Sequence, residues 1–386
     1  MTARASRPRT FKRSRDSRPR AIKRAKAYHP ERDSDNPDLP NPSIVYLSTA
    51  YSHCNRKDVE ECFYDPPLED DEVINFLATV NEAVMETIKP KIIDTWPNTY
   101  TFTKAIAENI IRKTASDLPI AVVRPSQVHV SGTLKEPLCG WIDNVNGPNG
   151  AAAGSFAGLV RTGVCHAETK LNMIPVDMVA NCIIAAAFGA TTRDHNATIP
   201  IYNYVSGPNT FTFQENSDVV LERAFEVPSS QAIWCPLSIV FRSVFWYRVF
   251  AIFVHVMPAA LLDIGFIIKG HPPMLLKIYR KVDKYILSIK YFTRFNWNFD
   301  NMKCMSLYQS LSEEDKEIFY FDSNAYDWRD YLRNSLDGIR MYIFKESPDT
   351  IPAGKSRLMK DPSPSTVDTC NPQGQFCTGD FCLLFE

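Results

Sequence analysis

The sequence predicts an α/β fold in which short buried strands alternate with helices, followed by a mostly helical region. Apolar runs at residues 43–48, 118–124 and 199–205 have the continuous hydrophobicity of strands buried in a parallel sheet. Helix-forming stretches at 69–88, 101–116 and 177–187 alternate with these runs, as in a parallel sheet with helical connections. A chain of 386 residues with 45% hydrophobic residues is also long enough to bury a sizeable core.

The first 43 residues are predicted to form a basic, disordered tail. They carry 12 Lys and Arg residues against 5 Asp and Glu, and they lack the apolar periodicity needed for packing. A basic stretch can also bind nucleic acid in a salt-dependent way, but Phe11 and Tyr28 are its only aromatic residues, so the tail is the favoured interpretation. No apolar signal segment follows the basic residues, so the domain after them is expected to face the cytosol.

The rest of the chain is expected to divide into four parts. Residues 44–225 form the α/β domain, and residues 228–270 form an apolar segment in which 249–268 approaches the length of a membrane span. Because His255, Pro258 and Asp263 interrupt that stretch, a membrane-dipping hairpin, an apolar binding surface and an ordinary buried helical core all stay open. Residues 271–346 are predicted to be a helical domain, and residues 347–386 a disordered tail.

The ten cysteines are scattered along the chain without a CxxC pair or a cluster of histidines. Such spacings are typical of zinc sites, and the scattered positions do not suggest a small disulfide framework either. We therefore expect reduced, structural thiols and assign no metal ligand.

Tyr100 and Lys104 form the sharpest short motif, Tyr100-Thr-Phe-Thr-Lys104. Residues four apart on a helix share a face, so both side chains can act on one bound substrate. A nearby ammonium favours the phenolate and lowers the pKa of a tyrosine from about 10, which suits Tyr100 to act as a general acid. The same spacing also occurs by chance on solvated helices, so the motif does not decide the function alone.

Two hydroxyl side chains, Ser48 and Thr49, follow the first predicted strand. Open α/β sheets bind ligands at the carboxyl ends of their strands. A hydroxyl there can polarise a carbonyl oxygen that Tyr100 protonates, and Thr49 is the first candidate for this role, with Ser48 the second. The alternative is that both hydroxyls only end the strand by bonding to their own backbone.

Further motifs follow one another along the chain. In the α/β part they are Ser48-Thr-Ala-Tyr-Ser-His-Cys-Asn-Arg-Lys57, Pro97-Asn-Thr-Tyr-Thr-Phe-Thr-Lys-Ala-Ile-Ala-Glu108, Val123-Arg-Pro-Ser126, Gly140-Trp-Ile-Asp-Asn144 with Asn146-Gly-Pro148, and Ile174-Pro-Val-Asp177. In the helical part they are Pro258-Ala-Ala-Leu-Leu-Asp263, Tyr291-Phe-Thr293, Trp297-Asn-Phe-Asp300, Leu311-Ser-Glu-Glu-Asp315, Phe321-Asp322, Asp327-Trp-Arg329 and Gly338-Ile-Arg340. From residue 44 to about residue 346, the chain resembles alcohol-forming fatty acyl-CoA reductases, which are extended short-chain dehydrogenases.

The resemblance implies reduction of a long-chain acyl-CoA by NADPH, first to an aldehyde and then to the fatty alcohol. Thr49, Tyr100 and Lys104 fall on the family's catalytic positions, and Tyr100 and Lys104 would also contact the cofactor. The segment Arg124-Pro125-Ser126 would border the nicotinamide. Family members are associated with peroxisomal or endoplasmic reticulum membranes, so a membrane surface is an expected partner, and self-association is left open.

The sequence departs from the family's pattern at its N-terminal end. Its first glycine is Gly132, whereas a dinucleotide fold needs glycines after its first strand so that the backbone can approach the pyrophosphate. We therefore expect an incomplete Rossmann-like NAD(P)-binding domain that lacks its first strands and glycine loop and leaves strand 43–48 as an edge. NADPH binding would then be weak. An active reductase, a silent isoform that binds acyl chains or a partner, and a nucleic-acid-associated protein are ranked in that order.

Overall fold

The computed structural model describes residues 43–133, 140–193, 197–208 and 210–359. The expectations of a basic tail and of nucleic-acid binding at the N-terminus concern residues that lie almost entirely outside these ranges. The same is true of the expected C-terminal tail from residue 360 onward.

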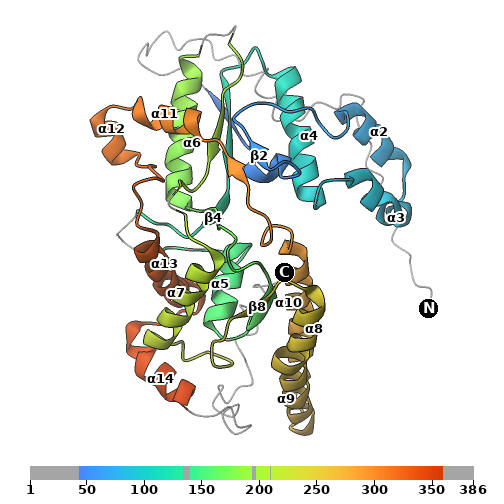
Figure 1. Cartoon of the computed structure of the whole chain (residues 1–386), viewed down its shortest axis with the longest axis vertical. Coiled ribbons are helices and arrows are strands. Elements are labelled where there is room, and N and C mark those ends of the chain that lie inside the picture. The colour runs from blue at the N-terminus through green and yellow to red at the C-terminus, as the bar shows by residue number, and fades with distance from the viewer. Residues whose placement is uncertain (1–42, 134–139, 194–196, 209, 360–386) are drawn as a thin grey trace, which may run out of the picture.

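A three-stranded parallel sheet in the order β1-β3-β7 forms the centre of the α/β part (Figure 1). Its strands are β1 (Ile44–Leu47), β3 (Ile120–Pro125) and β7 (Ile201–Tyr204). Every residue of the central strand β3 is buried, as the apolar run predicted. The predicted α/β class is confirmed. In the described part of the chain, β1 lies at one edge of this sheet.

Different helices cover the two faces of this sheet. Alternate residues of β3 point to opposite sides, so Ile120 and Val122 pack with α4 (Thr99–Thr114), whereas Ala121 and Val123 pack with α6 (Val176–Thr191). The single helix expected over residues 69–88 is instead two helices, α2 (Asp70–Thr79) and α3 (Glu82–Ile93). The break follows from Asn81, whose side chain accepts a hydrogen bond from the Val84 N–H and caps α3.

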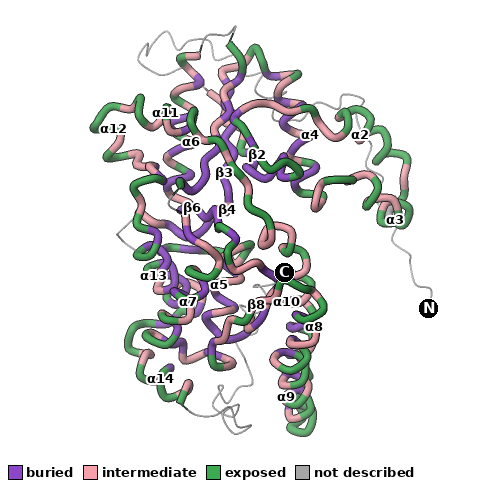
Figure 2. The backbone as a smooth tube through the Cα atoms, viewed as in Figure 1, coloured by how far each residue is buried: buried purple, intermediate pink, exposed green. Residues whose placement is uncertain are grey.

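The α/β part and the helical part share one hydrophobic core. Buried residues of the first, such as Val123 and Met173, belong to the same cluster as Trp328 and Leu336 of the second. Figure 2 shows buried stretches in both β3 and α13. The helices that meet there are α5 (Pro148–Phe156), α7 (Phe213–Glu226) and α13 (Trp328–Gly338), which continues into the π-helical turn η3 (Ile339–Ile343). This cluster joins residues 121–224 to residues 304–344, whereas the buried hydrophobic residues between 247 and 286 belong to a second cluster with Leu159 and Val164.

Within the apolar segment expected at residues 228–270, residues 244–268 form a continuous helical stretch that packs on one side. It consists of α8 (Val244–Ala251), the π-helical turn η2 (Ile252–Val256) and α9 (Met257–Ile268), and it packs against α10 (Leu275–Ile289). The polar residues that interrupt it are satisfied by the protein. His255 Nε2 accepts from the Arg161 N–H, and the Asp263 carboxylate accepts from three N–H groups at the start of α10.

The expected disordered tail is wrong for residues 347–359. The 3-10 turn η4 (Pro348–Thr350) and helix α14 (Ile351–Met359) are held by Arg340, which donates to the Ser347 carbonyl and the Thr350 hydroxyl, and by Arg357, which donates to the Ser230 carbonyl. The remaining elements are η1 (Ala50–His53), β2 (Asp58–Val59), β4 (Gln127–His129), β5 (Thr162–Val164), β6 (Met173–Pro175), β8 (Ile239–Phe241), β9 (Asn298–Phe299), α11 (Met302–Gln309) and α12 (Glu313–Ile318).

A close backbone contact between Gly140 and Gly338 joins the two parts, and we expect it to tolerate no side chain. A Cβ added at Gly338 would overlap the Gly140 carbonyl group. The substitution Gly338→Ala should therefore lower the free energy of unfolding by at least about 1–3 kcal/mol. The matched variant Gly265→Ala places a Cβ in open space on α9 and should be neutral or stabilise by up to about 1 kcal/mol. Urea unfolding of both variants is the measurement, and equal stabilities would contradict the packing argument.

Candidate active site

A cavity of about 450 Å³ opens at the carboxyl ends of the sheet strands. Its lining is mostly apolar and comes from both parts of the chain, including α5, α7 and the end of α10. Polar side chains gather where the cavity meets the sheet: Thr49, Tyr51, Tyr100, Ser126, Gln127 and His129. An apolar cavity with a few polar groups at one end of an α/β sheet is the usual form of a small-molecule site.

Thr49 brings a hydroxyl to this end of the cavity. It follows β1 and caps η1, where its Oγ1 accepts a hydrogen bond from the Tyr51 N–H at 3.3 Å. As a donor, the same hydroxyl reaches only the Pro125 carbonyl, at 3.5 Å. Thr49 thus bonds to nearby backbone, as the alternative interpretation of the sequence stated. The hydrogen bond that its hydroxyl donates is long, however, so the hydroxyl can rotate to donate to a substrate oxygen.

Tyr100 and Lys104 lie on one side of α4, whose first turn is capped by Asn98 through a hydrogen bond from the Thr101 N–H. The Tyr100 side chain lines the cavity and is 55% exposed, and its ring centre lies 5.9 Å from Lys104 Nζ. The ammonium donates to the carbonyl of Leu47, the last residue of β1, at 2.8 Å. Partial burial lowers the pKa of Lys104, against the opposing charge of Glu108.

Four of the proposed site residues do not line the cavity: Ser48, Lys104, Arg124 and Pro125. Ser48 is buried and donates its hydroxyl to Glu108, so of the two hydroxyl residues that follow β1 only Thr49 lines the cavity. Arg124 is fully buried and bonds to Glu108 and to the carbonyls of Glu60 and Cys62, so the expectation that it borders the nicotinamide is corrected. Arg124 lies on the same face of β3 as Ile120 and Val122, which pack with α4, and α4 carries its partner Glu108.

Ser126, the next residue but one, does line the cavity. Its Oγ is buried and has no hydrogen-bond partner among the described residues. Pro125 contributes its carbonyl group, which Thr49 contacts. An unpaired buried hydroxyl is costly, and a polar group of a bound ligand would satisfy it.

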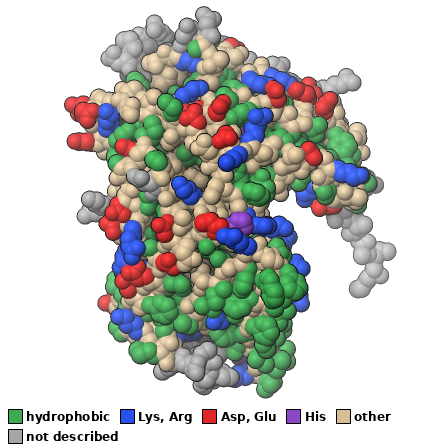
Figure 3. Space-filling model, viewed as in Figure 1, with side chains coloured by type: hydrophobic (Ala, Val, Ile, Leu, Met, Phe, Trp, Pro, Cys, Tyr) green, Lys and Arg blue, Asp and Glu red, His purple; other side chains and the backbone are tan. Residues whose placement is uncertain are grey.

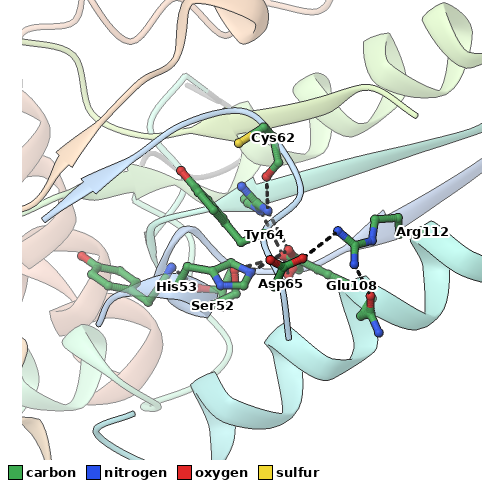
Figure 4. Close-up of polar contacts among 12 residues, drawn as sticks. Ser52, His53, Cys62, Tyr64, Asp65, Glu108 and Arg112 are labelled. Carbon is green, nitrogen blue, oxygen red and sulfur yellow. Dashed lines mark hydrogen bonds and ion pairs between the residues drawn. The ribbon is translucent and has the colours of Figure 1, made fainter. Parts of the chain in front are cut away.

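The buried carboxylate of Glu108 organises the end of the sheet behind the site (Figure 4). It accepts hydrogen bonds from Ser48, from Ser52 at 3.0 Å and from Arg124 at 2.6 and 3.0 Å, and it lies 3.3 Å from His53 Nε2. Burial alone would raise the pKa of Glu108, but the hydrogen bond from His53 and the charge of Arg124 outweigh it and hold that pKa at about 2. Glu108 was missed in the sequence. The sequence feature that could have revealed a buried carboxylate is Arg124, because an arginine in an otherwise apolar strand needs a buried partner.

The helical part of the chain closes the other side of the site. The Tyr51 ring lines the cavity and meets three aromatic rings edge-on, at centroid distances of 5.3, 5.3 and 5.4 Å: Phe292, Trp297 and Phe299. Strand β2 pairs with β9, and Tyr291 and Trp297 both donate to the Cys54 carbonyl. The Glu61 carboxylate also accepts from the N–H groups of Asn203, Lys303 and Cys304. Apart from the bond to Asn203, these contacts join segments about 240 residues apart, and none of them was predicted.

His129 is a neutral wall of the cavity. Its Nδ1 lies 3.1 Å from the Tyr331 hydroxyl, and that hydroxyl donates its hydrogen to the Val130 carbonyl. The Nδ1 atom must therefore be the donor of the pair. Burial lowers the pKa of His129 to about 4, so the ring stays uncharged at neutral pH and is not a proton donor there.

The residues at this end of the cavity fit the nicotinamide half of a dinucleotide. Thr49 and Tyr100 face one space, the unpaired Ser126 hydroxyl faces it too, and Lys104 stands beside Tyr100. In the described residues no glycine precedes Gly132, so they contain no glycine loop for a pyrophosphate ahead of the site.

Comparisons with known proteins show the family to which the chain belongs. Residues 38–183 match the NAD-binding region of the male sterility protein family, and residues 254–346 match its Sterile region. Together the two matches cover more than half of the chain. The chain belongs to the fatty acyl-CoA reductase family.

Named relatives in this family include fatty acyl-CoA reductase wat of Drosophila melanogaster, 34% identical over 82% of this chain and 60% of that protein. Fatty acyl-CoA reductase 1 of Xenopus laevis is 35% identical, and fatty acyl-CoA reductase 2 of Homo sapiens 31%, each over 82% of this chain and 61% of the relative. The chain thus spans about three fifths of the length of these reductases.

Solved structures similar to the chain include the terminal R domain from the myxalamid biosynthetic pathway. It has a TM-score of 0.42 and 13% identity, over 79% of this chain and 60% of that one. A thiolation-reductase di-domain from an archaeal non-ribosomal peptide synthetase has a TM-score of 0.42 and 12% identity, over 84% of this chain and 52% of that one.

We expect Glu108→Gln to destabilise the protein strongly. The substitution removes the charge that compensates buried Arg124, and an uncompensated buried charge costs about 3–5 kcal/mol. Urea unfolding at neutral pH measures the loss. The matched control Glu313→Gln breaks an exposed pair with Lys316 and should cost about 0–1 kcal/mol.

The same pair of variants tests the pH dependence. The folded pKa of Glu108 is about 2, which is lower than the value of about 4.3 for an unfolded chain. Its stabilisation is therefore complete above the unfolded value and is lost as the pH falls toward 2. Wild type and Glu313→Gln should lose this part of their stability in acid, whereas Glu108→Gln should not. A difference between wild type and Glu108→Gln that does not change with pH would contradict the assignment.

Proposed function

We propose that this chain carries the reducing site of a fatty acyl-CoA reductase that uses NADPH. The observation that supports it most is that Thr49, Tyr100 and the unpaired Ser126 hydroxyl meet at one end of a long apolar cavity. That end can hold a carbonyl group, and the rest of the cavity suits an acyl chain. The family relationship supports a nicotinamide cofactor and an acyl-CoA substrate.

In the proposed reaction, an acyl-CoA, two NADPH and two protons give the alcohol, free CoA and two NADP⁺, through an aldehyde. The bound cofactor supplies a hydride to the carbonyl carbon in each step. Thr49 and Tyr100 hold the carbonyl oxygen, and Tyr100 donates a proton to it as negative charge develops there. Lys104, fixed by the Leu47 carbonyl, stabilises the tyrosinate that results.

A second candidate function is acyl binding without reduction. The cavity requires no cofactor to hold an acyl chain, and no glycine precedes Gly132 among the described residues. Measurement of acyl-CoA binding and NADPH binding to the same purified chain separates the two candidates. Binding of both supports the reductase, and binding of acyl-CoA alone supports the second candidate.

Substitution of Tyr100 or Lys104 tests the proposed chemistry. Tyr100→Phe should lower kcat for palmitoyl-CoA by about 10²–10⁴-fold through loss of the general acid, with little change in stability because the side chain is half exposed. Lys104→Ala should weaken NADPH binding, followed by cofactor fluorescence, as well as turnover. Tyr320→Phe, which removes a hydroxyl bonded to the Asp322 carbonyl, is the matched control and should behave as wild type. A normal rate for Tyr100→Phe would remove it from the acid role.

We also propose that α8, η2 and α9 rest on a membrane surface. This stretch, Val244–Ile268, is long and apolar enough to span a bilayer, yet one side of it packs on α10. Its other side forms much of the apolar patch in the lower part of Figure 3. The large apolar side chains exposed on that side include Phe245, Trp246, Phe253, Leu261, Ile264 and Ile268. Exposed basic residues of α10, Lys277, Arg280 and Lys284, would lie close to lipid headgroups. A helix docked in this way is expected to lie in the interface rather than cross it.

Charged substitutions on this surface should release the protein from lipid. The triple variant Phe253→Glu, Leu261→Glu, Ile268→Glu should reduce co-sedimentation with phosphatidylcholine/phosphatidylserine vesicles at least tenfold. The variant loses three apolar side chains that would enter the lipid, and its new carboxylates are repelled by the anionic headgroups. The matched control Phe188→Glu, Met302→Glu, Ile318→Glu changes three equally exposed apolar side chains elsewhere and should sediment as wild type. Equal release of both variants, or of neither, would assign attachment to another part of the chain.

A further inference from the structure

Three walls run along the length of the cavity. The lining residues of α7 include Phe213, Ser217 and Val220, which recur at the spacing of one helix face. At 1.5 Å per residue, this face extends from Phe213 to Leu221 over about 12 Å. Helix α5 contributes one face in the same way, and strand β5 with its flanking residues forms a third wall. The cavity therefore runs beside about 12 Å of α7, and we call it the channel.

Contacts at the two ends of β5 show which end of the third wall lies near the catalytic end of the cavity. Cys165, just after β5, donates to the Thr293 carbonyl, and neighbouring Phe292 packs on Tyr51 at the catalytic end. Val160, just before β5, donates through its N–H to Gly154 near the far end of α5. The Ser217 and Ser238 hydroxyls are hydrogen-bonded to each other at 2.5 Å on the same far side. Gly163 thus lies part-way along the channel.

Gly163 leaves the wall open at this point. A Cβ added there would meet only one described heavy atom within 4 Å, Val240 Cγ1 at 4.0 Å. Its backbone φ is not in the left-handed region, so the position does not require glycine for conformational reasons. A larger side chain at residue 163 would therefore fit the backbone and occupy channel volume.

We propose that the acyl chain of the substrate lies in this channel and that Gly163 is a specificity-determining residue that sets how long a chain can be accommodated. This inference rests on the proposed function and deepens it. At roughly 30 Å³ for a group the size of a water molecule or a methylene, the 450 Å³ cavity holds about 15 such groups. The nicotinamide and the reacting carbonyl occupy the catalytic end. On the order of ten carbon atoms then fit in the rest.

The test is acyl-CoA binding to the full chain, measured by calorimetry with a saturated series from hexanoyl-CoA to palmitoyl-CoA. Each buried methylene should strengthen binding about fourfold until the channel is full. Gly163→Val adds three carbon atoms to the wall. The affinity of this variant for acyl-CoA should therefore stop rising at a chain length two to four carbons shorter than in wild type. Palmitoyl-CoA should bind the variant at least tenfold more weakly than it binds wild type. The control Gly265→Val makes the same change on exposed α9, where the added Cβ meets nothing within 4 Å of the described atoms. It should keep the wild-type length dependence.

Thermal unfolding of each variant is measured alongside. If Gly163→Val does not fold, Gly163→Ala decides, and it should shift the length dependence in the same direction by about one carbon. Wild-type binding with an unchanged length dependence in the folded variant overturns the role of Gly163 alone. No binding of any acyl-CoA by wild type overturns the proposed function and this inference together.

Discussion

The buried carboxylate of Glu108 is the interaction on which the geometry of the site depends. A charge in this position would be prohibitively costly without partners, and Arg124, Ser48 and Ser52 supply them from two neighbouring strand ends. Tyr100, Lys104 and Glu108 are each four residues apart and lie on one side of α4. When Glu108 is fixed against the end of β1, Lys104 reaches the Leu47 carbonyl and Tyr100 faces the cavity beside Thr49.

A second constraint comes from the far end of the sequence. The aromatic rings around Tyr51 and the N–H groups that bind Glu61 belong to residues 292–304, so the helical part forms one wall of the site. The shared core, in which Val123 and Leu336 belong to one cluster, makes the two parts a single packed unit. An isolated α/β part would expose both the core and the Tyr51 ring, so the site requires both sequence regions even though its polar groups come from the first.

Local patterns predicted much of the fold, whereas long-range contacts decided the rest. The apolar runs at β1, β3 and β7 identified the parallel sheet because burial on both faces leaves a local signature. Tyr100 and Thr49 were found because one short motif and one strand end place them. Arg124 was misassigned because its partner Glu108 lies on another element, and the helix at Ile351–Met359 was missed because its support comes from Arg340 and Ser230. The channel itself is formed by faces of three distant elements, which no single stretch of sequence reveals.

Helix α10 connects the two apolar features of the molecule. Its buried residues Ile278 and Val282 belong to the cluster that supports α8 and α9, and Tyr285, Ile286 and Ile289 near its C-terminal end line the channel. If α8 and α9 rest on lipid as proposed, α10 lies between α9 and one wall of the channel, and α8 packs directly on β5, which forms another wall. An acyl chain is poorly soluble in water and partitions into lipid, so a binding channel adjacent to the membrane shortens the distance over which the chain is exposed. Membrane attachment and acyl binding would then depend on the same packing between α9 and α10.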